Sequence, residues 1–215
     1  MSISDKLKRI QSSIPNNVTL VAVSKTKPID CILEAYEAGQ KVFGENKVQE
    51  MTQKAELLPK DIEWHMLGHL QTNKVKFIAP FVSLIHSVDS EKLLKEINKR
   101  ATQNNRVIDC LLQFHIAEES SKFGLNKEEA MKILKIQSNY PNVRILGFMG
   151  MATFTSDKEQ IKKEFSSLHT IYKQVQKDYP KLKILSIGMS GDYLIAINRG
   201  SNMIRVGSAI FGTRQ

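Results

Sequence analysis

Residues 18–28, VTLVAVSKTKP, decide the fold, because they join a buried strand directly to the start of a helix. The apolar run has the β-branched bias of a strand. Pro28 suits the first turn of a helix, and Gly39 is placed to end it. The stretch therefore predicts a strand over residues 18–24 and a helix over residues 28–39.

The same alternation continues through the chain. Further strands are predicted at residues 41–43, 62–67, 81–88, 107–116, 143–149, 182–187 and 203–206, and the helices between them include 45–58 and 72–79. Eight strand–helix repeats predict an α/β fold, a single (β/α)8 TIM-type barrel over residues 1–215 with an extra N-terminal helix at 2–13. An open doubly wound sheet is the alternative. In both folds, functional side chains are expected at the C-terminal ends of the strands.

Composition indicates a soluble cytoplasmic chain. Hydrophobic residues make up 41% of its 215 residues, an ordinary supply for one core. The two cysteines are too few for a disulfide framework, and the sequence contains neither a signal peptide nor a membrane span. The net charge of +9 suggests an anionic partner. Since most lysines alternate with glutamates on helical faces, we expect a small phosphorylated molecule and no nucleic acid.

Lys25 is the most informative charged residue. It ends the first strand, where it is poorly solvated, and Lys27 adds a second cation nearby. Both effects lower the pKa of an amine, and a neutral lysine amine can form a Schiff base with an aldehyde. The alternative is a structural lysine paired with a carboxylate.

Two loops near the end of the chain have the composition of an anion site. Residues 188–192, GMSGD, follow the seventh strand, and Gly207 and Ser208 follow the eighth. Small and hydroxyl residues let backbone N–H groups approach an anion, and barrel enzymes often bind phosphate after strands seven and eight. The glycines could instead only form turns.

Arg205 lies within the eighth strand, where an unpaired guanidinium would be costly. It is therefore expected to face a partner near the barrel mouth, either a ligand or a strand-end carboxylate. Among the histidines, His65 and His69 lack the helical context of a zinc site. His86 ends a strand and could line the pocket. We predict no metal site.

Five motifs carry a family resemblance. They are residues 21–28, 43–50 (FGENKVQE), 64–74 (WHMLGHLQTNK), 86–90 (HSVDS) and 188–212. Together they resemble the pyridoxal-phosphate homeostasis proteins, single-domain barrels related to the N-terminal domain of alanine racemase. The resemblance runs in order over essentially the whole chain.

The resemblance implies a site for pyridoxal 5′-phosphate (PLP). Lys25 would hold PLP as a covalent Schiff base, and Arg205 would face the pyridine nitrogen. The phosphate would be bound by Ser190, Gly207 and Ser208. Asn46 would lie near the ring, with His86 and Met151 lining the pocket. The sequence departs from the family pattern at Asn202, Ser208 and Phe123, of which Ser208 keeps the hydroxyl.

Two functions are compatible with this site. The first is a PLP carrier or regulator in vitamin B6 homeostasis, a monomer without a robust activity or catalytic residues of its own, which could serve PLP-dependent apo-enzymes. The second is a PLP-dependent amino-acid racemase. Racemisation by two bases needs a group on each face of the intermediate. In alanine racemases one of these groups comes from a second domain that this sequence lacks, so the carrier is favoured.

Overall fold

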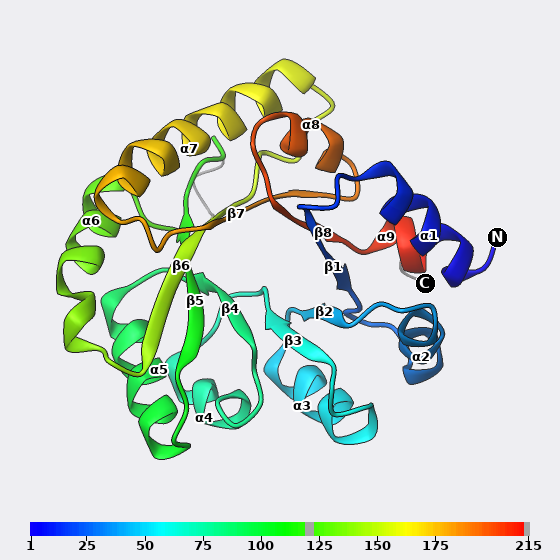
Figure 1. The fold of residues 1–215 in the computed structure, drawn as a ribbon, viewed down its shortest axis with the longest axis horizontal. Helices are drawn as coiled ribbons and strands as arrows, with labels where there is room; N and C mark the ends of the chain where they lie inside the picture. Colours follow the sequence, from blue (N-terminus) through cyan, green and yellow to red (C-terminus); the bar gives the residue numbers. More distant parts are fainter. Residues whose placement is uncertain (119–122, 213–215) are drawn as a thin grey trace.

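The computed structural model describes residues 1–118 and 123–212. Parallel strands form a closed barrel in the order β1 to β8, with helices around it (Figure 1). The strands are β1 (Thr19–Val23), β2 (Val42–Glu45), β3 (Glu63–Met66), β4 (Leu84–Val88), β5 (Ile108–Phe114), β6 (Val143–Gly150), β7 (Ile184–Met189) and β8 (Met203–Val206). The helices are α1 (Ile3–Ser13), α2 (Ile29–Glu37), α3 (Val48–Leu57), α4 (Val75–Ile78), α5 (Glu91–Gln103), α6 (Lys127–Ile136), α7 (Lys158–Asp178), α8 (Tyr193–Asn198) and α9 (Ser208–Phe211), with 3₁₀ turns η1 (Thr72–Lys74) and η2 (Gln137–Asn139).

Barrel closure confirms the predicted (β/α)8 fold and excludes the open sheet. β1 pairs with β2 on one side and with β8 on the other, and Val21 is opposite Arg205 across the β1–β8 seam. The ends of the first and last strands are therefore neighbours. This places the segment after β1 beside the segments after β7 and β8.

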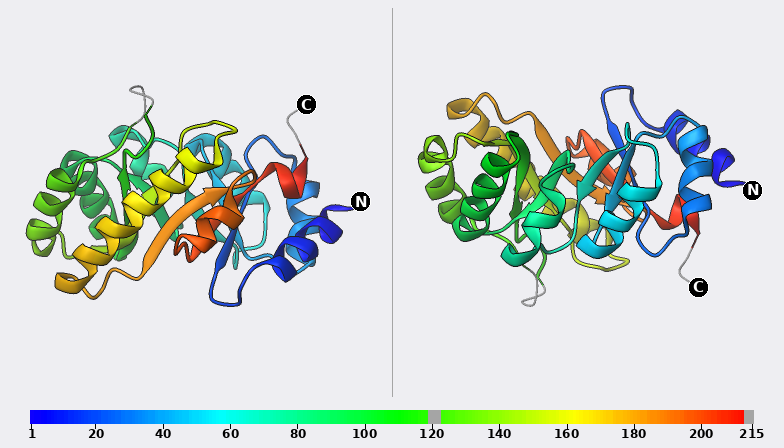
Figure 2. Two further views of the ribbon diagram at one scale, coloured as in Figure 1. Left: turned by 90° about the horizontal axis from the view of Figure 1, so that it is seen from above. Right: turned by 90° about the horizontal axis from the view of Figure 1, so that it is seen from below.

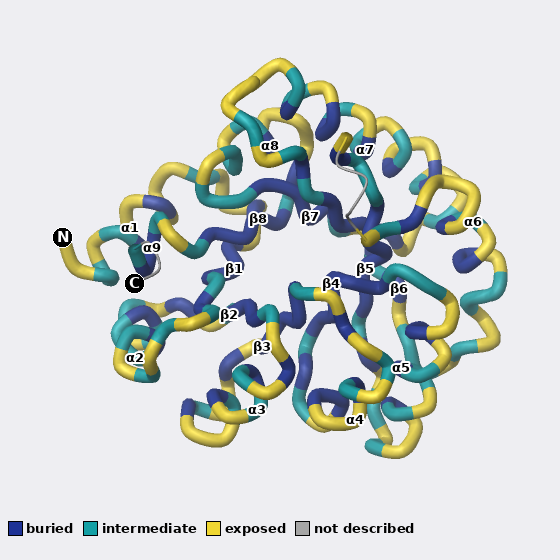
Figure 3. Tube along the Cα trace, turned by 180° about the vertical axis from the view of Figure 1, so that it is seen from behind, coloured by how far each residue is buried: buried dark blue, intermediate teal, exposed yellow. Residues whose placement is uncertain are grey.

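The barrel has two apolar layers. The larger one lies between the sheet and the helices, and Figure 3 shows the buried strands inside a ring of helices whose outer faces are exposed. Side chains alternate along each strand, and those that point away from the helices fill the barrel interior. They form a smaller cluster with Val21, Leu67, Leu84, Leu111, Met149 and Met203. Because the interior is packed, a ligand can enter only at an end of the barrel.

The extra helix α1 begins with a capping box. Asp5 N–H donates to Ser2 Oγ at 3.0 Å, and Ser2 N–H donates to the Asp5 carboxylate at 3.1 Å. Leu7 and Ile10 are buried on the face toward the barrel. Figures 1 and 2 show α1 beside α2 and α9, on the outside of the β1 segment. The beginning and end of the described chain thus pack together.

Some element boundaries differ from the prediction. Glu45 was expected in a helix, but it ends β2, and α3 begins only at Val48. The reason is tertiary: the Glu45 side chain is fully buried and receives hydrogen bonds from Ser24 and Lys54. The expected helix 72–79 divides into η1 and α4. Within residues 1–118 and 123–212, none of the helices is both long and apolar enough to cross a membrane.

Candidate functional site

A pocket of about 500 Å³ opens at the C-terminal ends of the strands. Its lining includes most of the residues predicted for cofactor binding: Lys25, Asn46, Met151, Ser190, Arg205, Gly207 and Ser208. These residues follow or end β1, β2, β6, β7 and β8. Barrel closure therefore brings together side chains that are far apart in the sequence.

Lys25 is half-buried and directly follows β1. The chain turns sharply after it, since Lys27 N–H donates to the Ser24 carbonyl at 3.0 Å. Within this turn Thr26 has φ of 64°, a left-handed conformation that is uncommon for a β-branched residue. The backbone on both sides of Lys25 is consequently fixed.

Arg205 forms the floor of the pocket and is only 5% exposed. Its guanidinium donates to the Ser186 carbonyl and hydroxyl oxygens, both at 2.7 Å, and to the Gly150 carbonyl at 2.9 Å. No carboxylate in the described part of the chain forms an ion pair with it, so the expected alternative of a strand-end salt bridge is not observed. Burial lowers the pKa of Arg205 to about 10, while the charge of Asp192 opposes the change. Arg205 therefore stays cationic at neutral pH.

The loops after β7 and β8 are joined by Ser190. Its hydroxyl oxygen accepts from Gly207 N–H at 3.1 Å and from Ala209 N–H at 3.5 Å. Gly188 has φ of 99°, and a Cβ there would lie 2.5 Å from Ala196 Cβ, so only glycine fits this turn. Hydroxyls and backbone N–H groups thus gather at one end of the pocket, as an anion site requires.

His86 does not line the pocket. It is fully buried, with Nδ1 3.2 Å from Ser186 Oγ and Nε2 3.0 Å from His65 Nδ1. Because the Ser186 hydroxyl accepts from Arg205, its own proton is available to His86. Burial lowers the pKa of His65 to about 3 and that of His86 well below its usual range. His86 is therefore uncharged and contacts Arg205 through the Ser186 hydroxyl. The alternation of side chains along its strand was the sequence signal that His86 points into the barrel.

Other predicted residues lie away from the pocket. Asn202 bridges β7 and β8, accepting from Leu185 N–H at 2.8 Å and donating to the Lys183 carbonyl at 2.6 Å. Phe123 stacks on His69 with ring centroids 3.9 Å apart. These two departures from the family pattern are thus outside the pocket lining. Among the described residues, no group of three or more His, Cys, Asp or Glu side chains could hold a metal ion.

The sequence assigned no individual role to three residues that line the pocket, namely Thr153, Thr155 and Asp192. Lys27 also lines it, and the sequence identified Lys27 only as a cation near Lys25. All of them follow strands, so their place in the chain was an available signal. A position after a strand does not show which side chains of the loop point into the pocket. Asp192 Oδ1 accepts from Met189 N–H at 2.5 Å, and burial raises the pKa of Asp192.

The donor set fits the cofactor implied by the sequence. An aldehyde needs an amine, a pyridine nitrogen that stays unprotonated needs a fixed cation, and a phosphate needs N–H and hydroxyl groups. Lys25, Arg205 and the Ser190 region supply these groups around one pocket. Its volume of about 500 Å³ lies within the range of about 300–1,000 Å³ for small-molecule sites.

Known proteins resemble this chain over nearly its whole length. The family described as alanine racemase, N-terminal domain, matches residues 2–215. A pyridoxal phosphate homeostasis protein of Vibrio alginolyticus is 40% identical, covering 93% of this chain and 88% of that protein. PipY of Synechococcus elongatus, solved with PLP bound, is 35% identical with a TM-score of 0.91, covering 98% of this chain and all of that one.

A more distant likeness extends to a larger enzyme. The alanine racemase of Bartonella henselae, solved with covalently bound pyridoxal phosphate, has a TM-score of 0.75 and 17% identity. The match covers 98% of this chain but 58% of the racemase. At this identity the likeness concerns the fold alone.

Proposed function

Because the chain belongs to the pyridoxal phosphate homeostasis protein family, we propose that it binds PLP in the barrel-mouth pocket and takes part in controlling the level of this cofactor. The observation that carries the proposal is the convergence of Lys25, Arg205 and the Ser190 loop on one pocket. An aldehyde-bearing pyridine phosphate needs an amine, a fixed cation near its ring nitrogen and an anion site, and this pocket offers all three.

Each part of the pocket has a role in this proposal. Lys25 holds PLP covalently as a Schiff base, Arg205 faces the ring nitrogen, and Ser190, Gly207 and Ser208 bind the phosphate. Asn46 and Met151 lie beside the ring. His86 acts through Ser186 and keeps Arg205 in place, instead of contacting the cofactor.

The nature of Arg205 favours holding the cofactor over turning over a substrate. Bound PLP supplies an electrophilic aldehyde and an electron-withdrawing ring. A permanent cation beside the ring nitrogen disfavours protonation of that nitrogen. The ring is then a weaker electron sink than it is beside a carboxylate. We therefore infer a carrier, acting as a cytoplasmic monomer with residues 1–215 as one domain and PLP-dependent apo-enzymes as recipients.

Amino-acid racemisation is the competing function. It is favoured by one observation: Lys27 and Asp192 line the same pocket as Lys25, so a second titratable group is near the proposed cofactor site. A racemase assay on homogeneous, PLP-loaded protein with several L-amino acids separates the two functions. Turnover at or above about one per second, ordinary for an enzyme, would exclude the carrier.

The absorbance spectrum of the purified protein before and after borohydride tests PLP binding itself. We expect a yellow protein in which borohydride fixes the cofactor to a Lys25 peptide. Lys25→Ala should lose this adduct, whereas Lys27→Ala, which removes the neighbouring pocket lysine, should keep it. An unchanged adduct in Lys25→Ala would show that the assignment of Lys25 is wrong.

A further inference from the structure

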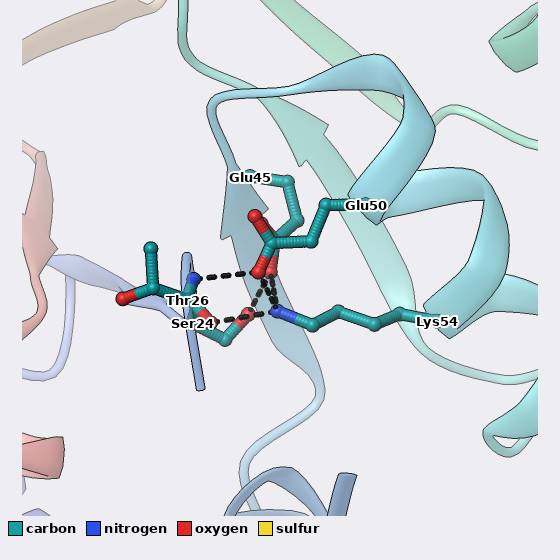
Figure 4. A network of polar contacts seen from close by, with 5 residues as sticks. All are labelled: Ser24, Thr26, Glu45, Glu50 and Lys54. Atoms are coloured by element: carbon teal, nitrogen blue, oxygen red, sulfur yellow. Dashed lines mark hydrogen bonds and ion pairs between the residues drawn. The ribbon is translucent and has the colours of Figure 1, made fainter. Parts of the chain in front are cut away.

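A buried polar cluster lies behind the segment that carries Lys25 (Figure 4). Lys54 Nζ, on α3, donates to the Ser24 carbonyl at 2.8 Å, to Glu45 Oε1 at 2.7 Å and to Glu50 Oε1 at 2.6 Å. The Ser24 hydroxyl also donates to Glu45 Oε1, at 2.6 Å. The cluster therefore ties α3 and the end of β2 to the end of β1.

The cluster holds both peptide groups that flank Lys25. On one side, the Ser24 carbonyl accepts from Lys54. On the other side, Thr26 N–H donates to Glu50 Oε1 at 2.5 Å. These two groups belong to the Ser24–Lys25 and Lys25–Thr26 peptide units, so fixing both restricts the backbone dihedrals of Lys25 and the direction of its side chain.

The left-handed conformation of Thr26 supports the same conclusion. A β-branched residue with φ of 64° is strained and persists only where its surroundings hold it. The Glu50 carboxylate provides that hold by accepting the Thr26 N–H. Without Glu50, Thr26 is expected to relax from its left-handed conformation to one with negative φ.

Stability alone does not account for a cluster of this kind. Lys54 is 5% exposed and Glu45 is fully buried. Among residues 1–118 and 123–212, nothing forms a hydrogen bond with Glu45 Oε2. Replacing a buried ion pair with apolar side chains of similar volume is often neutral or stabilising. Apolar side chains would fill this space with a smaller desolvation penalty. The charged cluster, however, forms hydrogen bonds that hold the backbone on both sides of Lys25.

We propose that Glu50 and Lys54 are positioning residues that orient the Lys25 amine toward the aldehyde of PLP. Neither residue lines the pocket. The proposal rests on the function proposed above, because Glu50 and Lys54 would act on the step in which Lys25 binds PLP covalently. In that step the neutral amine of Lys25 forms a C=N bond to the aldehyde carbon. The aldehyde oxygen leaves as water with the two amine protons, and nothing is oxidised or reduced.

The decisive variant is Glu50→Ala, since it removes the acceptor for Thr26 N–H at a partly exposed position. Glu96→Ala is a matched control: Glu50 and Glu96 are both 22% exposed, and each forms an i,i+4 ion pair at 2.6 Å, Glu96 with Arg100 on α5. Glu50→Gln keeps an oxygen that can accept from Thr26 and serves as the conservative rescue.

Two measurements on the cofactor-free full chain separate positioning from general damage. The first is the rate at which added PLP forms the borohydride-reducible adduct. The second is the affinity for pyridoxine 5′-phosphate, which has the ring and phosphate but an alcohol in place of the aldehyde. We expect Glu50→Ala to slow adduct formation about 10- to 100-fold while the analogue affinity stays within about twofold, because a small misplacement of a reacting group has effects of that size.

Each other outcome has a defined meaning. Glu50→Gln and Glu96→Ala should form the adduct at nearly the wild-type rate. The proposal is overturned if Glu50→Ala forms it as fast as Glu96→Ala, or if Glu50→Ala loses analogue affinity as strongly as rate. A wild-type chain that forms no adduct at all would instead refute the proposed function.

Discussion

Replacing Lys54 with methionine should destabilise the fold in a pH-dependent way. Methionine has a similar length but no charge, so Lys54→Met leaves the fully buried Glu45 carboxyl without its cation. In the wild-type chain, burial raises the pKa of Glu45, while the charge and hydrogen bond of Lys54 and the hydrogen bond of Ser24 oppose that rise. Without Lys54, folded Glu45 should bind a proton at neutral pH.

The size of the effect follows from the cost of that proton. The ordinary pKa of this glutamate is 4.5, so protonation at pH 7 spans 2.5 pH units. At about 1.36 kcal/mol per unit, the part of the lost unfolding free energy that is due to this proton is at most about 3 kcal/mol at pH 7 and below about 1 kcal/mol at pH 5. The sign is fixed because the folded variant holds a proton that the unfolded chain releases above pH 4.5. Stability is therefore lost as the pH rises from 4.5 toward the folded pKa.

Urea unfolding at pH 5 and pH 7 measures this difference. We expect Lys54→Met to lose about 2–3 kcal/mol more unfolding free energy at pH 7 than at pH 5. A further loss, the same at both pH values, comes from the missing hydrogen bonds of Lys54 to Ser24 and Glu50. The double variant Lys54→Met/Glu45→Gln should not show the extra loss at pH 7, since it has no buried acid. Lys162→Met, which breaks an exposed ion pair with Glu159, should cost about 0–1 kcal/mol. Equal losses by Lys54→Met at both pH values would refute the reasoning.

Three further predictions concern the site and the barrel. Arg205→Gln should weaken PLP retention about 10- to 100-fold in equilibrium dialysis, because a charged donor is lost; unchanged retention would remove Arg205 from the site. The ring resonances of His65 should not titrate between pH 5 and pH 8 in NMR spectra, because burial lowers its pKa to about 3. Gly147→Ala should lower the unfolding free energy by about 1–3 kcal/mol in urea titrations, since the added Cβ would lie 1.8 Å from the Ile184 carbonyl oxygen. If Gly147→Ala unfolded at the same urea concentration as the wild type, β6 and β7 would be able to make room for the methyl group without loss of stability, and the prediction would be wrong.

The sequence predicted the strands well because most of them are short, largely apolar runs between turn signals. It placed Lys25 at a strand end, and the structure has it directly after β1. Glu45 was assigned to a helix, because a glutamate in a polar stretch carries no local sign of burial. Its strand position depends on Ser24 and Lys54, which are distant in the sequence. His86 was predicted to line the pocket, but its hydrogen bonds to Ser186 and His65 hold it in the barrel interior, behind Arg205.

By itself, the sequence determined the α/β class, the repeat of eight strands and the strand ends at which polar residues gather. These features depend on local periodicity and composition, which are written directly in the chain. Only the tertiary structure decided that β1 pairs with β8, and so which of those residues share a pocket. It also decided that Ser24 and Thr26 are held from α3, because hydrogen bonds between distant residues form only when the barrel closes.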